Sequence, residues 1–195
     1  MKRNSWLMQT LAVAAVVFAS AASAAPVLSI SPATKTVDVG QTFSLDVSIS
    51  DVTDLYAYQF DIQFDPLRLS AISVQEGAFL PSGGSTLFVP GTIDNTSGTI
   101  TFTADSLIGA VSGVTGSGVL ANILVQAKAT GVSSIDTLNV TLLDSNLGTI
   151  SANVAGSRVT VQQTSGAPEP GTLALLGLGL AGLGIARRRN QKGTA

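Results

Sequence analysis

Hydrophobic and polar residues alternate with a period of two over most of the chain between residues 27 and 162. In the segment 41–50 every second residue is apolar, and the segment 55–65 repeats this pattern with aromatic and aliphatic side chains. Successive side chains of a strand point to opposite faces, so the alternation predicts strands that each bury one face. The strands predicted in this way are residues 27–31, 41–50, 55–65, 69–75, 86–89, 99–104, 119–129, 134–143 and 157–162.

Clusters of Gly, Asn and Asp separate these segments and predict turns at Gly83-Gly84 and over residues 94–98, 113–118 and 144–146. The segment 119–129 contains Ala and Leu, but its period of two and its flanking glycines favour a strand over a helix. About nine short strands, each with one apolar face, predict an all-β fold in which two antiparallel sheets pack as a sandwich.

The first 24 residues have a different pattern. Lys2 and Arg3 precede an apolar stretch that extends to Ala19, and small residues follow up to Ala24. This is the pattern of a secretory signal peptide, with cleavage expected after Ala24 and export of the rest of the chain. An uncleaved membrane anchor is the alternative, but the apolar stretch is short for a membrane span.

The last thirty residues, 166–195, contain three parts in order. Pro-Glu-Pro at 168–170 precedes the uncharged, mostly apolar segment 171–186, and three arginines follow at 187–189. As a helix, the apolar segment would extend about 24 Å, somewhat less than a hydrocarbon core of about 30 Å. The segment therefore predicts a short transmembrane helix, and the positive-inside rule leaves the main domain facing the periplasm or the exterior.

This tripartite tail resembles the PEP-CTERM sorting signal of Gram-negative bacteria. The resemblance implies processing by an exosortase, a membrane-embedded protease, and a final location at the cell surface or in an exopolysaccharide and biofilm matrix. An ordinary tail anchor, the alternative, would not need the Pro-Glu-Pro motif. On this resemblance the recognition residues are Pro168, Glu169 and Pro170, and the cytoplasmic anchor is formed by Arg187, Arg188 and Arg189.

The domain between the two ends, residues 25–165, is acidic. It contains four basic and eleven acidic residues, for a net charge of −7. Such a domain lacks the basic surface of a nucleic-acid-binding protein. The whole chain contains neither Cys nor His, which excludes a Ser-His-Asp triad, a thiolate nucleophile and a structural zinc site. These absences favour a non-enzymatic protein.

Four motifs follow one another in this domain: Val39–Phe43, the segment 58–66 that ends in Asp-Pro, the segment 118–129, and Val159-Thr160-Val161. Their order and spacing resemble a cohesin domain, a nine-stranded jelly-roll sandwich related to carbohydrate-binding modules. The resemblance covers roughly residues 27–162 and implies a protein-binding module, because cohesins of cellulosomes bind calcium-loaded dockerins. The relation to carbohydrate-binding modules leaves binding of an extracellular polysaccharide as the alternative.

Aspartates are the remaining candidates for chemistry. Asp61 and Asp65 lie on one face of a predicted strand, about 13 Å apart, which is farther than the two carboxylates of a glycosidase. An Asp-based hydrolase is therefore the weakest hypothesis, and a solvated polar face explains both residues better. Tyr56 and Tyr58 share the parity of Phe60 and are expected in the core.

The other Asp and Asn residues fall in predicted turns, where their side chains accept backbone hydrogen bonds. No EF-hand-like loop is present to supply the six to eight oxygens that calcium needs. We therefore expect no cofactor, and calcium is the one ion left as a candidate. These turn residues are Asp51, Asp54, Asp94, Asn95, Asp144 and Asn146.

Overall fold

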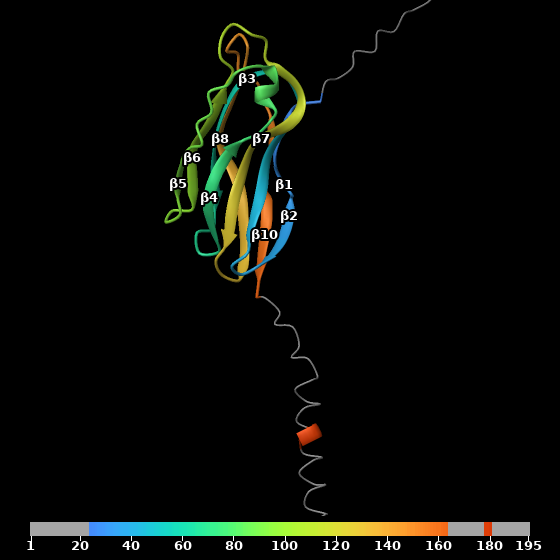
Figure 1. Cartoon of the computed structure of the whole chain (residues 1–195). Helices are drawn as coiled ribbons and strands as arrows, with labels where there is room; N and C mark the ends of the chain where they lie inside the picture. The colour runs from blue at the N-terminus through green and yellow to red at the C-terminus, as the bar shows by residue number, and fades with distance from the viewer. Residues whose placement is uncertain (1–23, 164–177, 181–195) are drawn as a thin grey trace, which may run out of the picture.

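The computed structural model describes residues 24–163 and 178–180. Over residues 24–163 the chain forms strands joined by turns and one short 3₁₀ helix, which confirms the predicted all-β class (Figure 1). The elements are β1 (Val27–Ser31), β2 (Thr34–Asp38), β3 (Thr42–Phe64), β4 (Leu69–Glu76), η1 (Leu80–Gly83), β5 (Thr92–Asp94), β6 (Thr99–Ser106), β7 (Val114–Ala127), β8 (Gly131–Asp144), β9 (Asn153–Ala155) and β10 (Ser157–Gln162).

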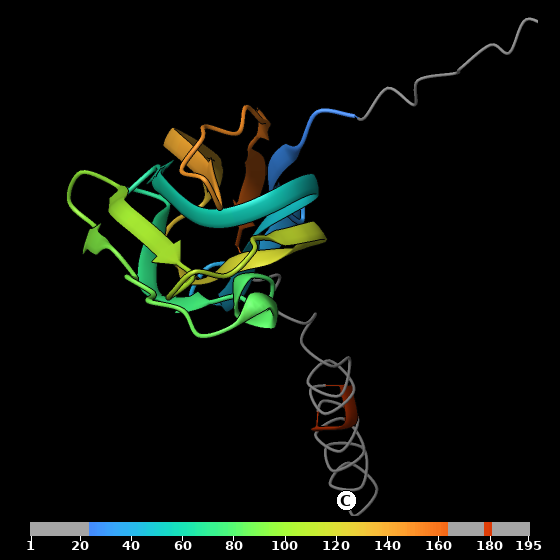
Figure 2. The same cartoon turned by 90° about the horizontal axis from the view of Figure 1, so that it is seen from above.

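The long strand β3 belongs to both layers of the sandwich. Its first half pairs with β1 and β7, and its second half pairs with β6 and β8. One layer therefore has the order β9-β1-β3-β7-β4, and the other has the order β5-β6-β3-β8-β10-β2. Figure 2 shows β3 as a strongly curved ribbon that passes from one layer to the other. The predicted sandwich is thus one continuous sheet that curls over its own core.

Two aspartates let β3 curve. Asp51 and Asp54 have positive φ angles of 55° and 58°, and the pairing with β7 shifts register on both sides of Val52. A polar residue such as Asp tolerates this left-handed conformation better than a bulky one. The prediction of two strands, 41–50 and 55–65, with both aspartates in a turn between them, is therefore wrong, because two β-bulges keep the strand continuous.

The carboxylate of Asp54 also joins two loops at the end of the sandwich. Its Oδ2 accepts a 2.6 Å hydrogen bond from Ser145 Oγ, and its Oδ1 accepts one of 2.6 Å from the Gly113 amide. These bonds hold the pKa of Asp54 below its ordinary value, and the hydrogen bond from the Ser145 side chain has the largest effect. Asp54, which bends β3, thus also holds in place the loop before β7 and the loop after β8.

The core is formed by the inward faces that the alternation predicts. Every second residue from Phe43 to Ile49 is buried, as are Tyr58 and Phe60. The rings of these two aromatic residues are stacked with centroids 5.6 Å apart, and the hydroxyl of Tyr58 donates a 2.6 Å hydrogen bond to the Leu120 carbonyl. Tyr56 is only half-buried, and its hydroxyl reaches the Gly109 carbonyl at 2.7 Å.

Strands β2 and β9 are absent from the sequence-based prediction. Only Val37 of β2 is buried, and β9 is exposed throughout. Each of these strands pairs in parallel with a strand remote in the sequence, β2 with β10 and β9 with β1. Their backbones are ordered by that pairing rather than by an apolar face of their own, so alternation does not reveal them.

Three further boundaries differ from the prediction. Residues 86–89, predicted as a strand, make only two isolated bridges, from Val89 to Ala104 in β6 and from Thr86 to Leu107 just after β6. The three-residue strand β5 begins at Thr92 and overlaps a predicted turn at Asp94. The strand predicted over 119–129 is confirmed up to Ala127, where β7 ends. Strand β7 also starts earlier, at Val114, inside the glycine-rich segment that was expected to turn.

The predicted role of Asp and Asn in turns is confirmed at two positions. The Oδ1 of Asp94 accepts the Thr96 amide at 2.8 Å, and the Oδ1 of Asp144 accepts the Asn146 amide at the same distance. Asn95 has a different role, since its side chain bonds both the amide and the carbonyl of Ala71 in β4. These side chains therefore close turns and connect neighbouring strands.

Candidate protein-binding face

A groove lies on the outer face of the layer that contains β8, β3 and β6. Ala57 and Gln59 alternate with the buried Tyr58 and Phe60 along β3, so their side chains point away from the core. The groove above them has a volume of about 370 Å³, and apolar atoms form most of its walls. Its outward-facing residues are Ala57, Gln59, Leu87, Val89, Phe102, Ala104, Ser106, Thr141 and Leu143.

The segment 86–89 forms one wall of this groove. The amides of Leu87 and Val89 donate hydrogen bonds of 2.9 and 2.7 Å to the carbonyls of Ser106 and Ala104 in β6. In this extended segment Leu87 and Val89 are exposed, while Phe88 between them packs against the core. The result is an apolar rim beside β6 rather than a polar sheet edge.

Phe102 is the exposed aromatic residue of the groove. Its side chain is 58% exposed, and its φ of 60° lies in the left-handed region that bulky residues rarely adopt. Simple alternation from the buried Ile100 would place Phe102 in the core, but the bulge in β6 moves it to the outer face. Such strain at an exposed apolar residue is typical of binding sites, and the sequence pattern alone gives no sign of it.

Asp61 lies on the same outer face and contacts both neighbouring strands. Its Oδ1 accepts the Phe102 amide at 2.7 Å, and its Oδ2 accepts the Asn139 side-chain amide at 2.7 Å. Asp65 has separate partners, the Leu67 amide at 2.9 Å and the Arg68 Nε at 3.8 Å. The structure therefore gives these two aspartates separate structural contacts and does not bring them together as a pair.

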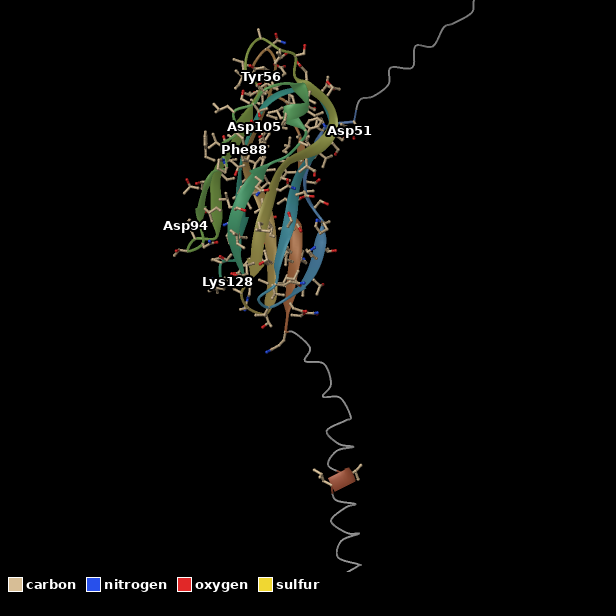
Figure 3. The ribbon with its side chains drawn as sticks, in the orientation of Figure 1. Asp51, Tyr56, Phe88, Asp94, Asp105 and Lys128 are labelled. Atoms are coloured by element: carbon tan, nitrogen blue, oxygen red, sulfur yellow. The ribbon has the colours of Figure 1, made fainter. Side chains whose placement is uncertain are left out.

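A pair of carboxyl groups lies under the segment 86–89. Asp105 is 3% exposed, and its Oδ2 has no hydrogen-bond partner in the described residues. Burial and the neighbouring charge of Glu76 raise the pKa of Asp105 to about 7. Glu76 in turn accepts a hydrogen bond from the Thr86 hydroxyl, and Figure 3 shows Asp105 near Phe88 on this side of the domain.

The alternation pattern of the sequence does not predict that Asp105 is buried beside Glu76. The alternation of β6 predicts that Ile100 and Phe102 share a face, and on that parity Asp105 would be solvated. The bulge at Phe102 reverses the parity, so that Thr103 and Asp105 turn inward. The one usable signal is the polar residue at the end of an otherwise apolar strand, which does not distinguish a buried carboxyl group from an exposed one.

No group of three or more Asp or Glu side chains is placed to hold a metal ion within residues 24–163 and 178–180. In the same part of the chain, no helix is both long and apolar enough to span a bilayer. Of the predicted membrane segment 171–186, residues 178–180 are described, and they are helical.

Ala24, the predicted cleavage position, is exposed immediately before β1. The predicted sorting residues Pro168, Glu169, Pro170, Arg187, Arg188 and Arg189 lie outside the described residues.

The described domain is thus a curled sandwich that presents an apolar groove on the outer face of β8, β3 and β6. The sequence matches the cohesin domain over residues 28–166. It matches the PEP-CTERM protein-sorting motif over residues 167–189. The chain belongs to the cohesin domain family, whose members are protein-interaction modules, and it carries a sorting motif that implies export and membrane anchoring before processing.

Solved cohesin structures share the fold. The sixth cohesin of scaffoldin B from Acetivibrio cellulolyticus, solved in complex with a mutant Cel5 dockerin, is 19% identical with a TM-score of 0.58, and the match covers 71% of this chain and 100% of that one. A non-cellulosomal cohesin from the archaeon Archaeoglobus fulgidus is 10% identical with a TM-score of 0.57, and the match covers 73% and 94% of the two chains. No curated protein matches this sequence. At these identities the likeness shows the fold alone.

Proposed function

We propose that this protein is exported, sorted by an exosortase to the cell envelope or biofilm matrix, and binds another protein there through the outer face of β8, β3 and β6. The observation that carries this proposal is the apolar groove from which the strained Phe102 protrudes. An exposed apolar cluster of this kind is typical of a docking surface. The rest of the acidic domain keeps it soluble.

The partner that fits best is a dockerin-like protein module. Several of the similar cohesins were solved with dockerins bound, which supports a partner of this class. The groove offers aliphatic side chains such as Leu87 and Leu143 to an apolar ridge of the partner. In this arrangement any calcium belongs to the partner, as the resemblance to cohesins implies, and this chain needs no cofactor.

Association with an extracellular polysaccharide is the alternative. Binding of a sugar ring needs flat aromatic surfaces and several polar groups around them. The mature domain contains no Trp, and in the described residues the groove has one exposed aromatic ring, Phe102, among aliphatic walls. A protein surface therefore suits the groove better than a glycan.

Capture of the partner tests the proposed function. Immobilised residues 25–165 should retain a specific protein from the envelope and matrix fraction of the producing organism in calcium, and a chelator should release it. Calorimetry with that purified protein should then show one-to-one binding. Binding of the organism's exopolysaccharide on a glycan array, with no protein retained under either condition, would contradict the proposal and favour the alternative.

The tail gives a second prediction. We propose that residues 1–24 are a signal peptide, 25–165 the binding domain and 166–195 the sorting signal. Deletion of residues 168–195 should release the domain directly to the medium, because no segment then holds it in the membrane. Loss of the exosortase should instead leave the tail attached, and intact-mass analysis would detect it. An intact tail ending in its arginines on protein released from normal cells would contradict the sorting proposal.

A further inference from the structure

The two strands that flank the second half of β3 bulge at the same level. The pairing of β3 with β6 shifts register between Phe60 and Ile62, and its pairing with β8 shifts between Gln59 and Asp61. Phe102 in β6 and Asn139 in β8 have positive φ angles of 60° and 50° there. Asp61 therefore lies between two bulges that face each other across β3.

The Asp61 carboxylate bonds to both bulges. Its Oδ1 accepts the backbone amide of Phe102 and its Oδ2 accepts the side-chain amide of Asn139, each at 2.7 Å. A bulge leaves backbone groups without a ladder partner, and a charged acceptor makes the stronger kind of hydrogen bond. One side chain thus pairs with the displaced Phe102 amide of β6 and holds the Asn139 side chain at the bulge of β8.

The bulge in β6 decides which way its side chains point. Ile100 is buried before the bulge, and Thr103 is buried after it. Without the extra residue, Phe102 would follow the parity of Ile100 and enter the core. Because Asp61 bonds the Phe102 amide itself, it favours the conformation in which the aromatic ring stands in the groove.

We propose that Asp61 is the positioning residue of the binding face: by holding the bulges of β6 and β8, it fixes the exposed ring of Phe102 for contact with the partner. This inference rests on the proposed function and assigns it a specific determinant. Asp61 acts through Phe102 in this proposal, rather than as a hydrolytic carboxylate or as one of several solvated residues on a polar face.

Three variants separate these roles. Asp61→Ala removes both hydrogen bonds. Asp61→Asn keeps only a neutral amide oxygen as acceptor for the Phe102 amide, and Asn139 can turn its own amide oxygen toward the new NH2 group. The double variant Asp61→Asn/Asn139→Asp restores an amide–carboxylate pair with its direction reversed. The matched control is Asp136→Asn, which removes an exposed carboxylate from β8, the strand that also contains Asn139.

The first readout uses the free protein and needs no partner. In Asp61→Ala the Phe102 amide should exchange with solvent about tenfold faster or more, and its three-bond HN–Hα coupling should change from the left-handed to the extended value. The double variant should bring both quantities close to those of the parent, and Asp136→Asn should not move them. Unchanged exchange and coupling in a folded Asp61→Ala would overturn the proposal. If that variant does not fold, unchanged exchange and coupling in Asp61→Asn would overturn the proposal, because a neutral oxygen accepts the Phe102 amide more weakly than a carboxylate does.

The second readout is the affinity for the protein captured by residues 25–165. Asp61→Ala should weaken binding about tenfold, and the double variant should recover it to within a few-fold. Weak binding by a double variant that has regained the geometry of Phe102 would overturn the proposal, because Asp61 would then contact the partner itself. Expected results in the free protein with no partner retained would instead refute the proposed function, and with it the role of Asp61 in binding.

Discussion

Replacement of Asp105 by Asn should raise the free energy of unfolding at pH 8 by about 2–4 kcal/mol and leave it nearly unchanged at pH 4. Asp105 is buried beside Glu76, and its pKa is raised from 3.8 to about 7. Between pH 4 and 7 the folded protein therefore keeps a proton that the unfolded chain has already released. The contribution of this group to stability is full below pH 4, falls as the pH rises, and is constant again above about pH 7.

Asparagine is neutral at every pH, so it can lie beside Glu76 without the repulsion between two carboxylates. The measurement is urea denaturation of both proteins at pH 4, 6 and 8, with Asp136→Asn as the exposed control. The difference between Asp105→Asn and the parent should grow with pH, and that of the control should stay small. Equal differences at pH 4 and pH 8, or a destabilised Asn variant at pH 8, would contradict this account of the carboxyl pair.

The second large effect concerns binding. Phe102→Ala should weaken the affinity for the captured partner by roughly 30-fold or more, equivalent to about 2 kcal/mol. The exposed ring stands in the groove and would be buried by the partner, so its removal loses apolar contact area on the face. Surface plasmon resonance measures the change, which we expect mainly in the dissociation rate.

Ile72→Ala is the matched control for this prediction. Ile72 is an exposed apolar residue in β4, which belongs to the other layer. Its truncation should change the affinity less than two- to threefold. If Ile72→Ala weakens binding and Phe102→Ala does not, the partner binds the β4–β7 side and the proposed face is wrong.

The fold could be predicted wherever strands bury an apolar face. The alternation of residues 41–50 and the position of Tyr58 were enough to define the class and much of the core, because burial of one face requires that pattern. Strands β2 and β9 could not be found in this way, since the pairing of each depends on a strand more than a hundred residues away along the chain.

The candidate site could not be predicted in this way, because its side chains are placed by irregular positions in the strands. Several bulges change which face the following side chains point to; they lie at Asp51, Asp54, Phe102 and Asn139. A bulge inserts one extra residue into a strand, which a pattern of strict alternation cannot predict. For this reason Phe102 is exposed and Asp105 is buried, the reverse of what the pattern indicates. Asp61 was recognised as a candidate from the sequence, but its partners lie 41 and 78 residues away and became visible only in the structure.

The central claim is that a protein binds the outer face of β8, β3 and β6. Hydrogen exchange of residues 25–165, measured by mass spectrometry with and without the captured partner, tests it most directly. The account predicts that the partner slows exchange in residues 86–89, in β6, and in residues 138–143 of β8, with little change in β4. Slowed exchange confined to β4 and β7, with residues 86–89 and β6 unchanged, would contradict it.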